Sequence, residues 1–370
     1  MANKVMGVVN FEPSYCNVEG LEEYRPAAAI SVLGRYRIID FPMSNFANSG
    51  VQNINVFIKT APSSVIRHIQ DTNYNINSKR GKINLYPPER PVSNALFNTD
   101  LRAIAITLDT FRESNAEYVV VAPSHFIYTQ DYNKLIDEHK KAKNDITVLY
   151  QIVNNADKNF LDCDEITMSN GRVSEFKPNL GKKKKATISL ETYVMSKDLF
   201  VRLVIEGTQV SSAYWLRDII ADHVGDMKIG GVVHAASAYC VSSLMAYFNS
   251  TMHIRKENEV KALISDDWPI HTASFDAPPT LYQKDAKVKG CIVGNGCHID
   301  GTVTDSVIGR YVTIKKGAVV KNSILLPNAV VGENVKLENA IIDRYAVVSK
   351  IKTLKGKDDE PVYVSRREHV

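Results

Sequence analysis

The pattern of hydrophobic and polar positions divides the chain into two parts. Up to about residue 268, short apolar runs such as 4–9 and 118–122 alternate with stretches such as 100–114, whose apolar residues recur every three or four positions. Continuous apolar runs are typical of strands buried on both faces of a parallel sheet, and the longer period is typical of amphipathic helices. The first part is therefore predicted to be an α/β domain.

Local signals predict the remaining elements of this domain. We expect a helix capped by Asp40 and ended by Gly50, followed by a strand over 51–58. The polar segment 73–91 predicts a long surface loop. Further strands are predicted at 146–153, 189–195 and 232–241, helices at 131–143 and 215–223, and a hairpin at 166–176 around Asn170 and Gly171.

The second part has a different period, because apolar residues recur mostly every six positions from residue 281 onwards. This spacing is typical of a left-handed parallel β-helix with three six-residue faces per coil. The following positions predict roughly four stacked coils: Val288, Val293, Ile299, Val303, Ile308, Ile314, Val320, Leu325, Val331, Leu337, Ile342 and Val348. Three nearby prolines mark a linker. We therefore predict an α/β domain over 1–268, a linker over 269–280, and a β-helix with a C-terminal tail over 281–370.

Composition narrows the class of protein. A length of 370 residues, with 44% hydrophobic and 23% charged residues, is ordinary for a globular protein of two domains. The formal net charge of +4 gives no support for a nucleic-acid or membrane partner, and the basic run 182–185 is predicted to be a solvated loop. Five scattered cysteines fit a reducing compartment, and neither a cleavable leader nor a membrane-spanning run is predicted. We expect a cytoplasmic protein.

Two segments resemble a known family. Residues 34–51, GRYRIIDFPMSNFANSGV, with Arg25 and Pro26 before them, are similar to the sugar-nucleotide pyrophosphorylases that make ADP-glucose, and 325–334, LLPNAVVGEN, resembles the C-terminal domain of the same family. The resemblance implies a Rossmann-like nucleotidyltransferase domain (GT-A-like) followed by a left-handed β-helix. It also implies attack by the phosphate of glucose 1-phosphate on the α-phosphorus of ATP, assisted by Mg²⁺.

The positions that carry this chemistry in the family are substituted here. Counting back from Asp40, the family's lysine falls on Ala27. Alignment through residues 127–132 places one of its two Mg²⁺-binding aspartates at His125, and alignment through 246–249 places the other at Cys240. The glycine-rich phosphate loop is replaced by 10–15, which contains a proline without an N–H. Imidazole and thiol are poor Mg²⁺ ligands. We therefore predict no bound metal and no catalytic residue.

The side chains that replace the family's residues are predicted to have structural roles. His125 is expected to be a partly buried imidazole bonded to the backbone, and Cys240 a small core residue. Glu191 replaces a glycine that lies close to the carbohydrate in the family, and the helix over 215–223 has lost a second such glycine.

Basic residues are present at positions where the resemblance implies binding of a sugar phosphate or of an effector. The resemblance assigns Lys177 to the phosphate of the sugar phosphate, with a surface lysine as the alternative. Family effectors bind basic residues between the two domains. The candidates are Arg25, Arg35 and Arg37, facing Lys336 or Arg344, and ordinary surface salt bridges are the alternative.

Taken together, the resemblance and the losses predict a non-catalytic regulatory subunit of glucose-1-phosphate adenylyltransferase. Its expected partner is a catalytic paralogue in a heterotetramer of bacterial glycogen synthesis, with a homo-oligomer when alone and a sugar-phosphate effector. A weak pyrophosphorylase with relocated metal ligands and a β-helix scaffold that binds another protein remain alternatives. A hexapeptide acyltransferase is disfavoured because His298, the histidine within the repeat, is predicted to face outward.

Overall fold

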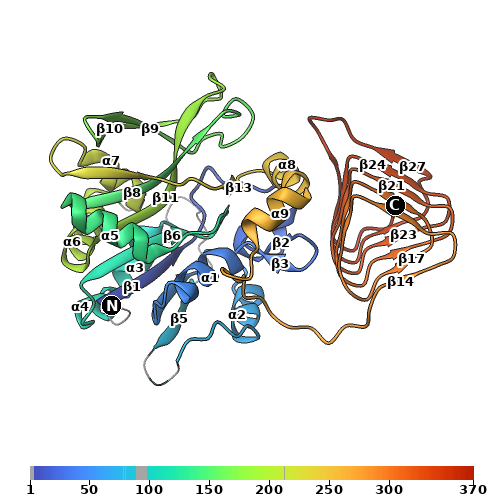
Figure 1. Cartoon of the computed structure of the whole chain (residues 1–370), viewed down its shortest axis with the longest axis horizontal. Coiled ribbons are helices and arrows are strands. Elements are labelled where there is room, and N and C mark those ends of the chain that lie inside the picture. The colour runs from blue at the N-terminus through green and yellow to red at the C-terminus, as the bar shows by residue number, and fades with distance from the viewer. Residues whose placement is uncertain (1–3, 78, 80, 89–97, 212) are drawn as a thin grey trace.

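The computed structural model describes residues 4–77, 79, 81–88, 98–211 and 213–370. Figure 1 shows an α/β domain and a stack of short strands, joined by an extended segment that contains Asp276. Residues 271–280 of this segment contain no helix or strand. This arrangement confirms the predicted fold class, an α/β domain followed by a left-handed parallel β-helix.

A nine-stranded sheet forms the centre of the α/β domain. Its order is β5 (Lys82–Tyr86), β4 (Asn53–Phe57), β1 (Val5–Asn10), β6 (Tyr118–Pro123), β11 (Ala186–Ser196), β8 (Ile146–Val153), β12 (Ile229–Val233), β10 (Arg172–Pro178) and β9 (Asp164–Ser169). Strands β5, β4, β1 and β6 are parallel, whereas β11 runs antiparallel to both β6 and β8. Because β1 is buried on both faces, its continuous apolar run was a reliable signal.

Helices cover both faces of this sheet. On one face, α1 (Asp40–Asn48), α2 (Ser63–Gln70) and α5 (Tyr132–Ala142) share one apolar core with the sheet. On the other face, α3 (Asp100–Ile106), α4 (Leu108–Arg112), α6 (Lys197–Val210) and α7 (Leu216–Asp222) share a second core. Two more helices, α8 (Leu244–Ile254) and α9 (Glu257–Leu263), follow the sheet in the chain. The domain thus has three layers, as an α/β domain requires.

Most predicted elements are confirmed, and four need correction. Asp40 is the first residue of α1 and does not cap it, because its carboxylate accepts hydrogen bonds from the Arg37 backbone and the His68 ring. The stretch 100–114 is divided into α3 and α4 at Thr107, which has a non-helical conformation. The stretch 232–241 belongs to two sheets, because β12 ends at Val233 and β13 (Tyr239–Cys240) pairs with β7 (Phe126–Ile127).

The fourth correction concerns the predicted surface loop over 73–91. Within it, β5 pairs in parallel with β4 and forms one edge of the large sheet. Its signal was weak because polar residues interrupt a short strand whose stability comes from the neighbouring strand. Residues 78, 80 and 89–91 of the same stretch lie outside the described part of the chain.

The β-helix consists of three parallel sheets of five strands each. Its strands are β14 (Leu281–Tyr282), β15 (Lys287–Lys289), β16 (Ile292–Val293), β17 (His298–Ile299), β18 (Thr302–Thr304), β19 (Val307–Ile308), β20 (Thr313–Ile314), β21 (Val319–Lys321), β22 (Ile324–Leu325), β23 (Val330–Val331), β24 (Lys336–Glu338), β25 (Ala340–Ile342), β26 (Val347–Val348), β27 (Thr353–Lys355) and β28 (Val362–Val364). Five layers are present where four coils were predicted. The strands outside the predicted repeat are β14 at its start and β27 and β28 at its end, where the loop over 356–361 interrupts the six-residue spacing.

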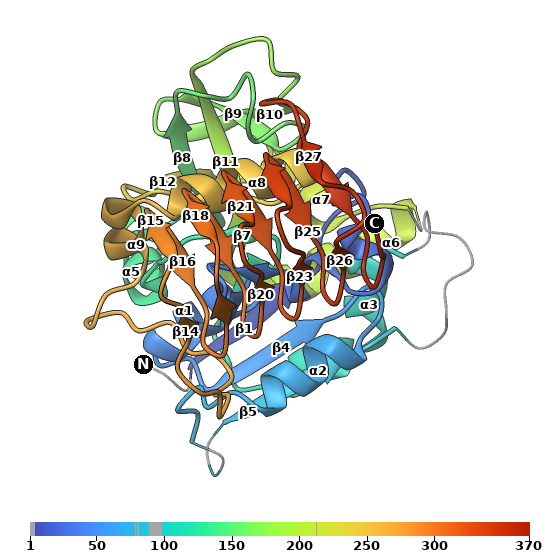
Figure 2. The ribbon, with the colours of Figure 1, turned by 90° about the vertical axis from the view of Figure 1, so that its right-hand side faces the viewer.

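One face of the β-helix packs on the α/β domain. Val307, Ile324 and Ile341, from the sheet that contains β19, β22 and β25, join an apolar cluster with residues of the first domain, including Ala27. Gly34 lies against this face with φ +68°, and a Cβ atom there would be 2.6 Å from the carbonyl oxygen of Ile308. A side chain at this position would therefore hold the two domains apart. Figure 2 views the coils from the side opposite this contact.

Candidate functional site

Five side chains from separate segments meet beside the ends of β1 and β6. We call them the Arg217 network: Tyr15, His125, Asp164, Glu191 and Arg217. The Arg217 guanidinium lies 2.6 Å from an Asp164 oxygen and 3.3 Å from a Glu191 oxygen. The Tyr15 hydroxyl donates to Glu191 at 2.6 Å and lies 3.1 Å from Nε2 of His125. The guanidinium also lies over the Tyr15 ring, 4.9 Å from its centre.

Local backbone structure places the two central charges. Glu191 has φ +47° within an irregularity of β11 between Ser189 and Thr192, where the register against β8 shifts. Arg217 is the second residue of α7, whose start is held by the bond from the Trp215 backbone to the Asp218 carboxylate, at 3.0 Å. The carboxylate and the guanidinium are therefore presented to each other by a bulge and a helix start.

Burial determines the electrostatics of the network. The side chains of Arg217, Glu191 and Asp164 are only 18%, 9% and 8% exposed. Burial raises the pKa of Asp164 to about 7, against the opposing effect of the Arg217 charge. Burial also lowers the pKa of His125 to about 4, so that its ring is neutral at pH 7. The Arg217 guanidinium thus pairs with two carboxyl groups at a site that is largely shielded from solvent.

The residues at the family's metal positions are both buried. His125 is completely buried, and its Nε2 contacts the Tyr15 hydroxyl instead of the expected backbone group, while its Nδ1 has no partner among the described residues. Cys240 is 3% exposed in the apolar core, with its sulfur 3.5 Å from that of Cys163. Burial raises the pKa of the Cys240 thiol well above its usual value, which disfavours the reactive thiolate.

Very little space remains between the network and the end of β1. A cavity of about 10 Å³ is lined by residues that include Asn10, Asp100, Glu191, Trp215 and Arg217. Its wall is tied together by Asp100, whose carboxylate accepts a hydrogen bond from the Asn10 amide at 2.5 Å and from the Leu216 backbone at 3.0 Å. Such a cavity has room for about one water molecule.

The residues of the network do not fit Mg²⁺. This ion requires several oxygen ligands in octahedral geometry. The oxygens available here, on Glu191 and Asp164, already pair with Arg217. In the part of the chain that the structure describes, no group of three or more His, Cys, Asp or Glu side chains is arranged to hold a metal ion. That the protein binds no Mg²⁺ remains a prediction.

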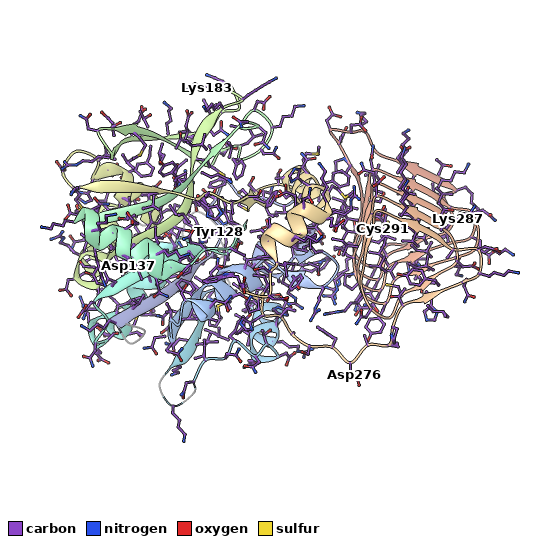
Figure 3. The ribbon with its side chains drawn as sticks, viewed as in Figure 1. Tyr128, Asp137, Lys183, Asp276, Lys287 and Cys291 are labelled. Atoms are coloured by element: carbon purple, nitrogen blue, oxygen red, sulfur yellow. The ribbon has the colours of Figure 1, made fainter. Side chains whose placement is uncertain are left out.

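Lys177 forms its ion pair outside the network, with Glu175. It is on β10, its side chain is 40% exposed, and its ammonium pairs with Glu175 on the same strand at 3.1 Å. The basic run over 182–185 is an exposed loop, as predicted, and Lys183 projects from it (Figure 3). His298 is also exposed on its strand, as predicted.

Arginines gather where the two domains meet. We call Arg25, Arg35, Arg37, Arg310 and Arg344 the arginine cluster. Burial, followed by the charges of Arg344 and Arg25, lowers the pKa of Arg37 to about 10. Burial and then the charge of Arg25 lower the pKa of Arg344, and burial and then the charge of Arg35 lower that of Arg310. Arg25, Arg37 and Arg344 are thus close enough to repel one another, and so are Arg35 and Arg310.

Arg25 of the cluster is paired with a buried carboxylate. Arg25 makes two hydrogen bonds, of 2.6 and 2.7 Å, to Asp343 of the β-helix. The Nε atom of Arg344 is buried without a hydrogen-bond partner among the described residues. Lys336 is not brought to the cluster, because β24 belongs to a different sheet of the β-helix from the one that contacts the first domain.

Sequence reasoning missed the Arg217 network and the role of Arg310. Glu191 was recognised as a replacement for glycine, but its partner Arg217 is 26 residues away in sequence, and Arg217 is 53 residues away from its other partner, Asp164. The available signal was the pair of opposite charges, Glu191 and Arg217, in the two segments that the resemblance places near the carbohydrate. Arg310 gave no signal, because its proximity to Arg35 depends on how the domains pack.

The architecture defines a class of protein. A model of the nucleotidyl transferase family matches residues 20–227, and a model of the GlmU-like C-terminal hexapeptide region matches residues 279–361. The chain belongs to the nucleotidyl transferase family.

Its relatives within that class have a more particular activity. The chain is 28% identical to a glucose-1-phosphate adenylyltransferase of Thiobacillus denitrificans, over 100% of the chain and 89% of the relative. It is 26% identical to a glucose-1-phosphate adenylyltransferase of Hydrogenovibrio crunogenus, over 97% and 90%. It is also 29% identical to the glycogen biosynthesis protein GlgD of Geobacillus stearothermophilus, over 86% and 84%.

None of the helices in the described ranges combines the length and apolar character that crossing a bilayer requires.

The buried His125 predicts a pH dependence of stability. Because its pKa is lowered to about 4 in the folded protein, the ring favours folding above its unfolded pKa, and this contribution is lost as pH falls from about 6.5 towards 4. Between about pH 7 and pH 4.5, the wild type should lose about 2.5 kcal/mol more unfolding free energy than His125→Asn. Urea unfolding at both pH values measures this difference. The exposed His298→Asn should behave as the wild type, and equal losses in wild type and His125→Asn would contradict the prediction.

Proposed function

We propose that this protein is a non-catalytic regulatory subunit of glucose-1-phosphate adenylyltransferase, acting with a catalytic relative in glycogen synthesis. The observation that carries the proposal is the Arg217 network, which occupies the region where phosphates and metal would have to meet. Relatives named as glucose-1-phosphate adenylyltransferases and as a glycogen biosynthesis protein support the pathway.

The energetics argue against catalysis by this chain alone. A nucleotide and a sugar phosphate would have to enter beside Glu191 and Asp164, whose negative charges repel them, and would have to detach Arg217 from both. Breaking a buried ion pair costs about 3–5 kcal/mol. Each missing preorganised charge, at Ala27, His125 and Cys240, removes roughly 2.7–4 kcal/mol of transition-state stabilisation in addition.

The arginine cluster supports a regulatory role. Guanidinium groups bind phosphate through paired hydrogen bonds, and Arg37, Arg310 and Arg344 provide them at the boundary between the domains. An anionic effector would relieve the repulsion among them. A sugar phosphate bound there would contact both domains at once, because Arg37 belongs to the first domain and Arg344 to the β-helix.

The proposal is tested by measuring ADP-glucose formation by this protein, by the catalytic relative from the same organism, and by the two co-expressed. We expect no product from this chain alone, and from the mixture either higher activity or a changed response to sugar phosphates. Arg37→Ala combined with Arg344→Ala should weaken that response while leaving co-purification intact. Activity of this chain alone that EDTA abolishes would show relocated metal ligands and overturn the proposal.

A further inference from the structure

A second, much larger cavity lies between the two domains. Its volume is about 690 Å³, within the range of roughly 300–1,000 Å³ that is common for small-molecule sites. Its lining comes from β8 and the segment after it, from α8, and from residues 322 and 358 of the β-helix. Cys240 is part of the lining, but none of the five residues of the Arg217 network, and none of the arginine cluster, lines it. We call it the interdomain cavity.

Side-chain amides dominate its polar lining. They are Gln151, Asn154, Asn155, Asn159, Asn249 and Asn322. Two of them are engaged, because Gln151 donates to the Ala236 carbonyl and Asn322 to the Asn339 side chain, each at 2.6 Å. The other four make no side-chain hydrogen bond to any described residue. Each amide offers both a donor and an acceptor to a ligand, which is the combination that a hydroxyl group requires.

The charges that line the cavity nearly cancel. Arg255 pairs with Asp305 at 3.0 Å, and its guanidinium also donates to the Gly290 carbonyl. His253 lies 3.0 Å from the Tyr239 hydroxyl. The remaining charged side chains of the lining are Lys256 and Asp358, one of each sign. The cavity therefore has no excess positive charge to select a phosphate, in contrast to the arginine cluster.

An apolar surface accompanies the amides. Phe160, Phe248 and Met252 are buried residues of the lining, and the partly exposed Tyr239 is tied through its hydroxyl to Glu259 at 2.6 Å. Such surfaces pack against the C–H faces of sugar rings, while unpartnered amides bind the hydroxyl groups at the ring edges. Small-molecule sites generally combine an apolar lining, which contacts the apolar parts of the ligand, with a few polar groups that orient it through hydrogen bonds.

We propose that the interdomain cavity binds a neutral carbohydrate, in the size range of an oligosaccharide. The class follows from the unpartnered amides, the apolar surface, the balanced charge and the volume. Because Asn249 lies on α8 and Asn322 on the β-helix, one ligand contacts both domains and favours their observed arrangement over separated ones. The proposal does not depend on the regulatory function proposed above.

The test is isothermal titration of the full chain with a panel of neutral probes: maltotriose, cellotriose and raffinose. At least one should bind saturably and raise the unfolding temperature. The double variant Asn154→Ala, Asn249→Ala should weaken that binding by at least about tenfold, since each lost hydrogen bond contributes on the order of 1 kcal/mol. Asn258→Ala with Asn295→Ala is the matched control, because both side chains are exposed, outside the cavity lining and without hydrogen-bond partners among the described residues.

Three results would overturn the proposal. One is the absence of saturable binding by any neutral probe. Another is unchanged affinity in the cavity double variant, or in Asn154→Ala alone if the double variant does not fold. The third is competition of inorganic phosphate with the neutral probe at equal concentration, which would place the binding at the arginine cluster.

Discussion

Arg217→Ala is expected to lower the free energy of unfolding by about 3–5 kcal/mol, because it leaves two buried carboxyl groups without their countercharge. Arg217 is the partner of both Asp164 and Glu191, at 2.6 and 3.3 Å, and all three side chains are largely buried. Urea unfolding at about pH 7.5, where the carboxyl groups are driven to ionise, measures the loss.

The network also predicts how this loss depends on pH and on a second substitution. Burial already raises the pKa of Asp164 to about 7 with Arg217 present, so protonation below that pH should reduce the penalty of the variant. Adding Glu191→Gln to Arg217→Ala should recover part of the lost stability, because it removes one of the two buried negative charges that have lost their partner. The exposed Arg202→Ala, on α6, is the control and should change stability by less than about 0.5 kcal/mol. If Arg217→Ala were as stable as this control, the network would not be the ion-pair system described here.

Asp343→Ala should cost a similar amount, about 3–5 kcal/mol, because it removes the buried carboxylate that neutralises Arg25. The side chains of Arg25 and Asp343 are 5% and 0% exposed, and the two residues come from different domains. The Tyr363 hydroxyl donates to the same carboxylate at 2.9 Å and would lose its acceptor as well. The loss should therefore appear as a weaker junction between the domains, measured by urea unfolding and by faster proteolysis within 269–280.

A double-mutant cycle separates the pair from its surroundings. Arg25→Met with Asp343→Ala should be less destabilised than the sum of the single variants, because the uncompensated charge is then absent. Asp305→Ala is the control: its pair with Arg255 also joins the domains, but Asp305 is 58% exposed, so the expected loss is only about 0–1 kcal/mol. Additive effects of Arg25→Met and Asp343→Ala would contradict a coupled buried pair.

Prediction from sequence worked where structure follows from local or periodic signals. The six-residue spacing predicted the inner column of the β-helix, because Val303, Val320 and Leu337 repeat at each coil and are all buried. The buried strands β1, β6 and β8 were predicted at nearly their observed bounds. The edge strand β5 was missed, because its conformation is stabilised by pairing with β4 and not by its own residues.

The sequence alone predicted the two architectures, and the resemblance it carries predicted that Ala27, His125 and Cys240 replace residues that act in catalysis in the family. Each of these inferences depends on residue type at a known position. What fills the site was decided only by the tertiary structure, because Glu191, Arg217 and Asp164 meet through a bulge, a helix start and a strand that the chain brings together over long separations. The same holds for Arg310 and Arg344, whose neighbours depend on which face of the β-helix packs on the first domain. The sequence gives the charged residues, but the strength of their interactions depends on burial and distance, which are set only when the chain is folded and the domains are packed.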